Sequence, residues 1–243
     1  MDNIDERNAF INMANIAPTE TMQGDLIEGY AAFAMSNNNI NYFDNNHQFT
    51  KECKTKLNSL NIKIFNIHGN HEERATNINT YKEIEFYGGT ALAEDEYPNI
   101  IFAIDGEIYN LPITDTTNKR CIVIGGAYSV DKYYRLERDY NWWENEQPSE
   151  EIKNYVEKQL EDNNWNIDYV ISHTCPYDFR PTEWFLPMIN QNRVDNSTEH
   201  WLQHIYNKVN FDKWYCGHFH GDKINRKANI RFLFRDIVKL GEY

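Results

Sequence analysis

Apolar positions along the chain follow two different periods, which predict strands and helices in turn. Short apolar runs at Ile62–Ile67 and Arg120–Ile124 are typical of buried strands. The sequence places further strands at 25–29, 81–87, 99–104, 167–172 and 213–217, with at least one more in the tail at 230–240. Asp105 and Gly106 form a hairpin signal that leads into a strand at 107–111.

A helical period appears in four segments. The clearest begins after Ser149, a predicted N-cap with acidic residues behind it, and carries an apolar stripe that ends at Leu160. Apolar residues also recur with helical spacing from Phe49 to Leu60. The sequence predicts two more helices at 5–14 and 197–209, and loops at 37–46 and 176–193. Helices interleaved with strands and hairpins predict a mixed α/β sandwich.

Length and composition favour one soluble domain. The chain has 243 residues, no internal repeat and no Pro/Gly/Ser-rich linker, so residues 1–243 are expected to form a single domain. No apolar run reaches the roughly 20 residues that span a bilayer. The acidic N-terminus is unlike a signal peptide, and the four dispersed cysteines are typical of reduced, buried thiols, so we expect a cytoplasmic protein without a membrane partner.

The charge balance limits the partners. The chain carries 24 Lys and Arg against 37 Asp and Glu, a formal charge of −13. This surface repels long polyanions, which argues against nucleic acid as a general partner. A small phosphorylated substrate remains compatible, because a bound cation inverts the local field.

Three predicted strands end in Asn or His. Asn70 follows the strand at 62–67, His173 follows the strand at 167–172, and His218 and His220 follow the strand at 213–217. Open α/β sheets bind ligands at such carboxyl ends, so we expect these side chains to meet. One carbonyl oxygen and three imidazoles suit Mn, Fe, Zn or Ni better than Ca or Mg.

Side-chain direction separates these residues by role. In an extended segment His218 and His220 would project to the same side, because side chains alternate with period two. His71 is adjacent to Asn70 and points elsewhere, so it is better placed to act on a leaving group than to bind a metal. His200 and His204 have helical spacing but lack the Glu of a zinc motif, and are expected on a solvated helix face.

Each motif taken alone is more typical of a structural feature. An Asn-His pair after a strand is usually a capping turn, a single His at a strand end is usually hydrogen-bonded there, and a His-x-His pair is more often exposed than ligating. Their combination in this order, all at strand ends, favours a metal site.

The combined motifs resemble the calcineurin-like metallophosphoesterase family. The resemblance rests on Gly69-Asn70-His71-Glu72, Ser172-His173, Gly217-His218-Phe219-His220 and Gly125-Gly126-Ala127, and covers residues 60–240. It implies a four-layer α/β/β/α sandwich of two mixed sheets flanked by helices. It also implies that Asn70, His173 and His218 bind one ion, that His220 binds a second, and that His71 lies beside the scissile phosphate.

The N-terminal part departs from the family pattern. The family opens with a strand ending in Asp-x-His, but no such motif precedes residue 69. We therefore expect residues 1–60 to be divergent or truncated, with the first central strand as the element that could be missing. The next motif, Gly-Asp, aligns with either Asp25 or Tyr30 at the bridging position. Asp2, Asp5, Asp25 and Glu72 are possible substitutes. With fewer carboxylates we expect one divalent transition-metal ion rather than two, and impaired hydrolysis.

Two functions follow from this sequence. The first is a metal-dependent phosphoesterase that hydrolyses a phosphomonoester or phosphodiester with a metal-activated water. Lys132 and Arg135 would then hold the substrate phosphate, the alternative for both being a solvated charged helix. The second is a catalytically inactive scaffold of the same family that binds a nucleotide or a protein partner. The sequence does not determine the oligomeric state.

Overall fold

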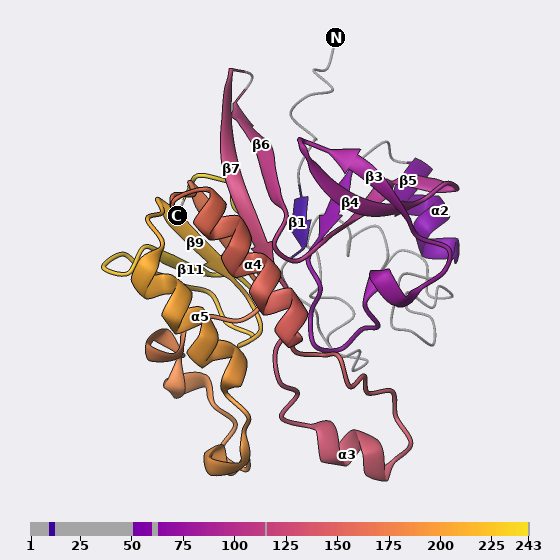
Figure 1. Ribbon diagram of the computed structural model, residues 1–243. Coiled ribbons are helices and arrows are strands. Elements are labelled where there is room, and N and C mark those ends of the chain that lie inside the picture. The colour runs from indigo at the N-terminus through magenta and orange to yellow at the C-terminus, as the bar shows by residue number, and fades with distance from the viewer. Residues whose placement is uncertain (1–9, 13–50, 60–62, 115, 243) are drawn as a thin grey trace.

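The computed structural model describes residues 10–12, 51–59, 63–114 and 116–242. Within these ranges the strands form two sheets, one of five strands and one of six. Figure 1 shows β3, β4 and β5 with α2 on one side of the molecule and α4 and α5 on the other. The helix α3 (Lys132–Glu137) lies out on a long loop below both.

The five-stranded sheet carries the first candidate turn. Its order is β1 (Phe10–Asn12), β2 (Ile64–Asn66), β5 (Tyr97–Ala103), β4 (Gly89–Glu94) and β3 (Lys82–Phe86). β2 is parallel to both β1 and β5, whereas β3 and β4 form an antiparallel pair. The helix α2 (Lys51–Ser59) packs on this sheet through Leu57, and the short turn η2 (Ala75–Asn77) follows β2.

The six-stranded sheet carries the other candidate residues. Its order is β10 (Lys223–Asn225), β11 (Ile230–Phe232), β9 (Lys213–Cys216), β8 (Tyr169–Ser172), β7 (Thr117–Ile124) and β6 (Ile108–Thr114). The four central strands are parallel, so the loops that follow β7, β8 and β9 all begin at the same edge of the sheet. The helices α4 (Glu150–Asp162) and α5 (Ser197–Lys208) cover its outer face.

Alternation along the strands builds the layers. On β7, Ile122 and Ile124 pack toward α4 and α5, whereas Cys121 and Val123 face a second core. That second core also contains Phe65 and other residues of the five-stranded sheet, so it lies between the two sheets. A third core joins the far face of the first sheet to α2. The result is the four-layer α/β/β/α sandwich expected from the sequence.

Several local predictions are confirmed. The helix predicted after Ser149 is α4, and the Ser149 side chain accepts a hydrogen bond from the backbone N of Ile152. Cys121, Cys175 and Cys216 are buried free thiols. No helix in the described ranges is long and apolar enough to cross a membrane.

Two local predictions are wrong. Residues 10–12, placed in a helix at 5–14, form β1 beside β2, so a strand does precede β2 in the described part of the chain. Asp105 and Gly106 make a turn but not a hairpin, because β5 and β6 belong to different sheets. The loop predicted at 176–193 is confirmed, and it contains the short turns η3 (Tyr177–Phe179), η4 (Thr182–Trp184) and η5 (Gln191–Arg193). The predicted strand at 25–29 and loop at 37–46 lie outside the described residues.

Candidate metal centre

Backbone hydrogen bonds join the ends of β7, β8 and β9. The N–H of His173 donates to the carbonyl of Ile124 at the end of β7, at 2.9 Å. The N–H of Gly217, after β9, donates to the carbonyl of His173, also at 2.9 Å. These bonds continue the parallel ladders past the strand ends, so the side chains that follow start from fixed backbone positions.

Three of the predicted ligands meet at this edge. His173 Nε2 lies 2.9 Å from Asn70 Oδ1, although the two residues are 103 positions apart in the chain. His218 Nδ1 lies 3.2 Å from the same His173 Nε2. Asn70 and His173 are almost fully buried, at 3% and 1% exposure. The Asn70 oxygen and the His218 nitrogen therefore both lie within 3.2 Å of His173 Nε2, and the three donors follow three different strands.

The spacing of these donors fits a shared divalent ion. Metal–donor bonds of about 2.1 Å place neighbouring donors of an octahedron about 3.0 Å apart, and those of a tetrahedron about 3.4 Å apart. The distances of 2.9 Å and 3.2 Å match such polyhedron edges. Among the described residues no group of three or more His, Cys, Asp or Glu is placed to hold a metal, and this cluster has two such residues together with an amide oxygen.

The electrostatics keep the cluster ready for a cation. Burial, together with the nearby His220, lowers the pKa of His218 to about 3. His218 is therefore neutral at physiological pH and keeps a ring lone pair for a metal. His68, buried behind the cluster, also has a lowered pKa, because of its burial and the neighbouring Arg74 and His173.

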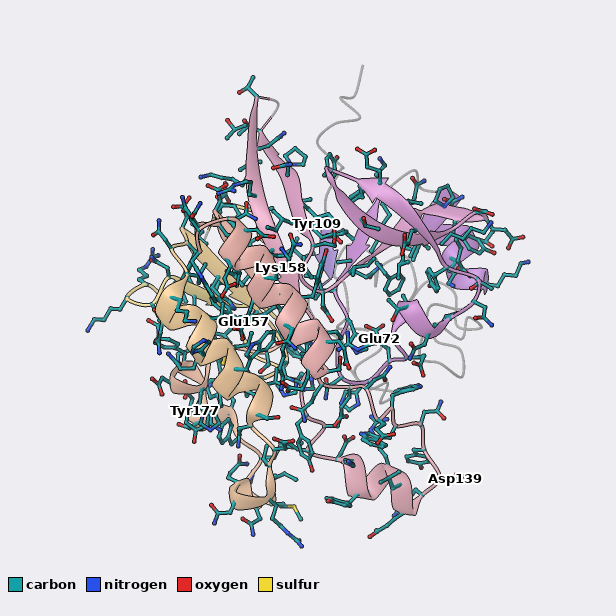
Figure 2. All side chains as sticks on the ribbon, in the orientation of Figure 1. Glu72, Tyr109, Asp139, Glu157, Lys158 and Tyr177 are labelled. Atoms are coloured by element: carbon teal, nitrogen blue, oxygen red, sulfur yellow. The ribbon has the colours of Figure 1, made fainter. Side chains whose placement is uncertain are left out.

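The turn after β2 is held against the end of β7. Gly126 N donates to the carbonyl of His68 at 2.9 Å, and a Cβ on Gly125 would lie 2.7 Å from that same oxygen. Asp105 accepts from the N–H of Gly125 and forms an ion pair with Arg74. In the view of Figure 2 the label of Glu72 marks this turn near the lower end of α4. Glycine at 125 thus permits the close approach of the two sheets.

Ser129 completes the surroundings of Asn70. Asn70 Nδ2 donates to Ser129 Oγ at 2.9 Å, and the Ser129 hydroxyl donates to the Asn70 carbonyl at 3.1 Å. Ser129 N in turn donates to the Glu146 carboxylate at 3.1 Å. Neither Ser129 nor Glu146 was predicted from the sequence. The one available signal was the position of Ser129 in the loop that leaves a strongly predicted strand.

His220 lies apart from this hydrogen-bonded cluster. Its ring stacks on Phe234 at 5.0 Å between centroids, and Asp131 lies near enough to raise its pKa against a larger lowering by burial. The premise of an extended His-x-His segment is wrong. Both His218 and His220 have positive φ, at 67° and 51°, and Phe219 N donates to the carbonyl of Gly217 within a tight bend.

The predicted catalytic and phosphate-binding residues lie in different settings. His71 is half-buried in the turn directly after Asn70. Arg135 is buried, and its guanidinium donates to Asp131 at 2.8 Å and to the Asn141 carbonyl at 3.1 Å. Lys132 lies over the Trp142 ring, 3.9 Å from its centroid. These contacts give Arg135 a structural role in holding the loop around α3.

One proposed substitute carboxylate can be placed. Glu72 is buried and accepts from the N–H of Gly69 at 2.9 Å, with His68 Nδ1 3.7 Å away. It therefore stabilises its own turn. Asp2, Asp5, Asp25 and the alternative bridging residue Tyr30 lie outside the described residues.

Comparison with known proteins adds one finding. The family model for calcineurin-like phosphoesterases matches residues 22–222, which is most of the chain and includes all three converging donors. No curated protein and no solved structure matches the chain significantly.

Proposed function

The chain belongs to the calcineurin-like phosphoesterase family, and on that premise we propose that it is a metal-dependent hydrolase of a small phosphomonoester or phosphodiester. The observation that carries the proposal is the convergence of Asn70 Oδ1, His173 Nε2 and His218 Nδ1. We propose that these three atoms hold one divalent transition-metal ion, with manganese the first to test. The ion would supply Lewis acidity and a water of lowered pKa.

The protein's own groups would do the rest of the work. His71, in the turn after Asn70, would lie beside the substrate and give a proton to the leaving oxygen. Lys132, on the loop that follows Ser129, is the remaining candidate for the substrate phosphate, because Arg135 is already paired with Asp131. His220, near His218, is the candidate for a second, weaker ion.

The composition of the site argues for low activity. The three converging donors are all neutral, so they offset the charge of a dication poorly. We therefore expect one ion rather than two, and slow hydrolysis. Buried free thiols at Cys121, Cys175 and Cys216 favour a reducing compartment, which supports a cytoplasmic location.

Turnover with a defined metal tests the proposal. The protein would be loaded with Mn²⁺ and assayed with p-nitrophenyl phosphate and bis-p-nitrophenyl phosphate. We expect slow, EDTA-sensitive turnover of at least one substrate. His71→Ala should lower it by about 10²–10⁴-fold without loss of metal, as expected for removal of a general acid. His218→Ala should lower both turnover and metal content.

A matched control comes from α5. His204 is exposed on this helix, so His204→Ala should leave turnover and metal content unchanged. If the wild-type protein binds one ion but turns over neither substrate, the inactive scaffold that binds a nucleotide or a protein is the better account. If it binds no ion and turns over neither substrate, the metal-dependent hydrolase is refuted and the inactive scaffold remains.

A further inference from the structure

The amide of Asn70 can point either its oxygen or its nitrogen at the two histidines, and only the oxygen can bind a cation. We propose that Ser129 is a positioning residue that fixes the Asn70 carboxamide with its oxygen toward His173 and His218. We propose further that Glu146 holds Ser129 in place. This inference deepens the proposed function and rests on it for its purpose, although the orientation itself can be measured without a metal.

The direction of the hydrogen bonds carries the argument. A serine hydroxyl has one hydrogen and two lone pairs. The hydroxyl hydrogen of Ser129 has two acceptors within reach, the backbone carbonyl of Asn70 and the Glu146 carboxylate, and an ionised carboxylate or a carbonyl can only accept. Toward the Asn70 side chain, 2.9 Å away, Ser129 Oγ therefore presents only lone pairs. The carboxamide must meet them with its NH₂ group, so its oxygen is left facing His173 Nε2.

Reversing the amide would be costly at this position. A flipped Asn70 would place its oxygen against the lone pairs of Ser129 Oγ and its NH₂ group against the ring nitrogens. Asn70 is 3% exposed and Ser129 is fully buried, so water cannot replace the hydrogen bond lost between the Asn70 side chain and Ser129 Oγ. A buried polar group without a partner costs more free energy than an exposed hydrogen bond contributes. The Ser129 contact therefore favours one orientation of the Asn70 amide over the other.

Glu146 anchors the serine from the other side. It is 2% exposed, and its carboxylate accepts from Ser129 N at 3.1 Å and from Trp142 Nε1 at 2.8 Å. Its backbone carbonyl accepts from Ala127 N at 3.1 Å. The hydrogen bonds from Ala127 and Ser129 to Glu146 close the base of the loop at 127–146, which carries α3. Ser129 is therefore held at this loop base by Glu146.

The orientation has a consequence for His173 that can be measured. Asn70 Oδ1 is an acceptor only, so a hydrogen bond between the two side chains in the metal-free protein needs its hydrogen on His173 Nε2, with His218 Nδ1 as a second acceptor 3.2 Å away. If the amide flips, its NH₂ group donates to His173 Nε2, and the imidazole hydrogen moves to Nδ1. The tautomer of His173 therefore reports which way Asn70 points.

Ser129→Ala tests the proposal through two readouts. In metal-free protein, ¹⁵N NMR of the imidazoles should show the Nε2–H form of His173 in the wild type and a mixture of both tautomers in the variant. The His173 signals are assigned by their loss in His173→Gln. Calorimetric titration with Mn²⁺ should show affinity about 10–100-fold weaker in Ser129→Ala, the usual effect of losing a partner behind a ligand.

Tyr109→Phe is the matched control. Tyr109 is fully buried on β6, and its hydroxyl also makes two hydrogen bonds, to Ile104 N and the Thr90 carbonyl. In the view of Figure 2 it lies well away from the turn marked by Glu72. Tyr109→Phe should lower Tm by an amount similar to Ser129→Ala while keeping the wild-type tautomer and affinity.

Each outcome decides one of the two claims. An unchanged His173 tautomer in folded Ser129→Ala overturns the positioning role, as does the same tautomer mixture in Tyr109→Phe. A changed tautomer with weakened Mn²⁺ affinity supports both claims. A changed tautomer in a protein whose wild type binds no Mn²⁺ leaves the positioning role standing and refutes the proposed metal function.

Discussion

At the residue scale, the site depends on which atom of each side chain faces its neighbours. Asn70, His173 and His218 could be predicted from the sequence because each follows a strand whose apolar run is visible locally. Ser129 and Glu146 could not, since their partners lie 59 and 17 positions away and a serine in a loop has no local signature. The bend at His218 and His220 also has no local signal in the sequence. The prediction of an extended His-x-His segment was therefore wrong.

A buried carboxylate beside the site gives a pH-dependent prediction. Glu199 is 4% exposed, and burial raises its pKa despite a hydrogen bond from Thr174. Its Oε2 is buried and has no hydrogen-bond partner among the described residues. The folded protein therefore holds the Glu199 proton more tightly than the unfolded chain does. Its contribution to stability is present below the unfolded pKa and is lost as pH rises through the folded pKa.

Glu199→Gln should remove that loss. We expect the variant to exceed the wild type in free energy of unfolding by about 1–3 kcal/mol at pH 7.5, the cost range of a buried group without its partner. The difference should shrink as pH falls to 4. Urea unfolding at both pH values measures it. Glu157→Gln is the control, because Glu157 is half-exposed and its carboxylate accepts from Trp201 Nε1. A difference independent of pH would contradict the account.

At the element scale, the turns at the strand ends position the site residues. The long elements with a clear period were the ones that could be predicted. The strand β7 and the helix α4 have clear periods, and both were expected. The strand β1 has three residues and forms by pairing with residues 64–66. The local pattern there predicted a helix instead, because this pairing cannot be read from nearby residues. Asp105 and Gly106 form a turn as expected, but only tertiary contacts send the next strand into the other sheet.

The turn after β7 offers a direct test of this positioning. Gly126 has φ of 85°, and a Cβ there would clash with the backbone carbonyl of Glu146. Gly126→Ala should therefore lower the free energy of unfolding by more than the about 1–2 kcal/mol that a left-handed backbone costs a residue with a Cβ. It should also weaken Mn²⁺ binding, because the displaced loop carries Ser129. Urea unfolding and calorimetric titration measure the two effects.

Gly88→Ala separates backbone strain from the clash. Gly88 has a similar φ of 81°, but its Cβ would meet only the side-chain nitrogen of Asn110, at 3.0 Å, which can move. The control should cost about the backbone penalty alone and leave metal affinity unchanged. Equal losses of stability in the two variants would show that the Glu146 contact does not constrain the turn.

At the scale of the whole molecule, the candidate centre joins the two sheets. Asn70 comes from the turn after β2 in the five-stranded sheet, and His173 and His218 follow β8 and β9 in the six-stranded sheet. A mixed α/β sandwich was predictable because amphipathic strands and helices alternate along the chain, and the four-layer arrangement was implied by the resemblance of the motifs to one family. The division of strands between sheets was not, since it is decided by packing between residues far apart in sequence.

The central claim is that three donors from two sheets share one metal ion. The most direct measurement is a crystal structure of the Mn²⁺-loaded protein with anomalous diffraction data. The account predicts one strong anomalous peak about 2.1–2.3 Å from Asn70 Oδ1, His173 Nε2 and His218 Nδ1 together. A fully loaded crystal with its peak elsewhere, or with these three side chains turned apart, would contradict it.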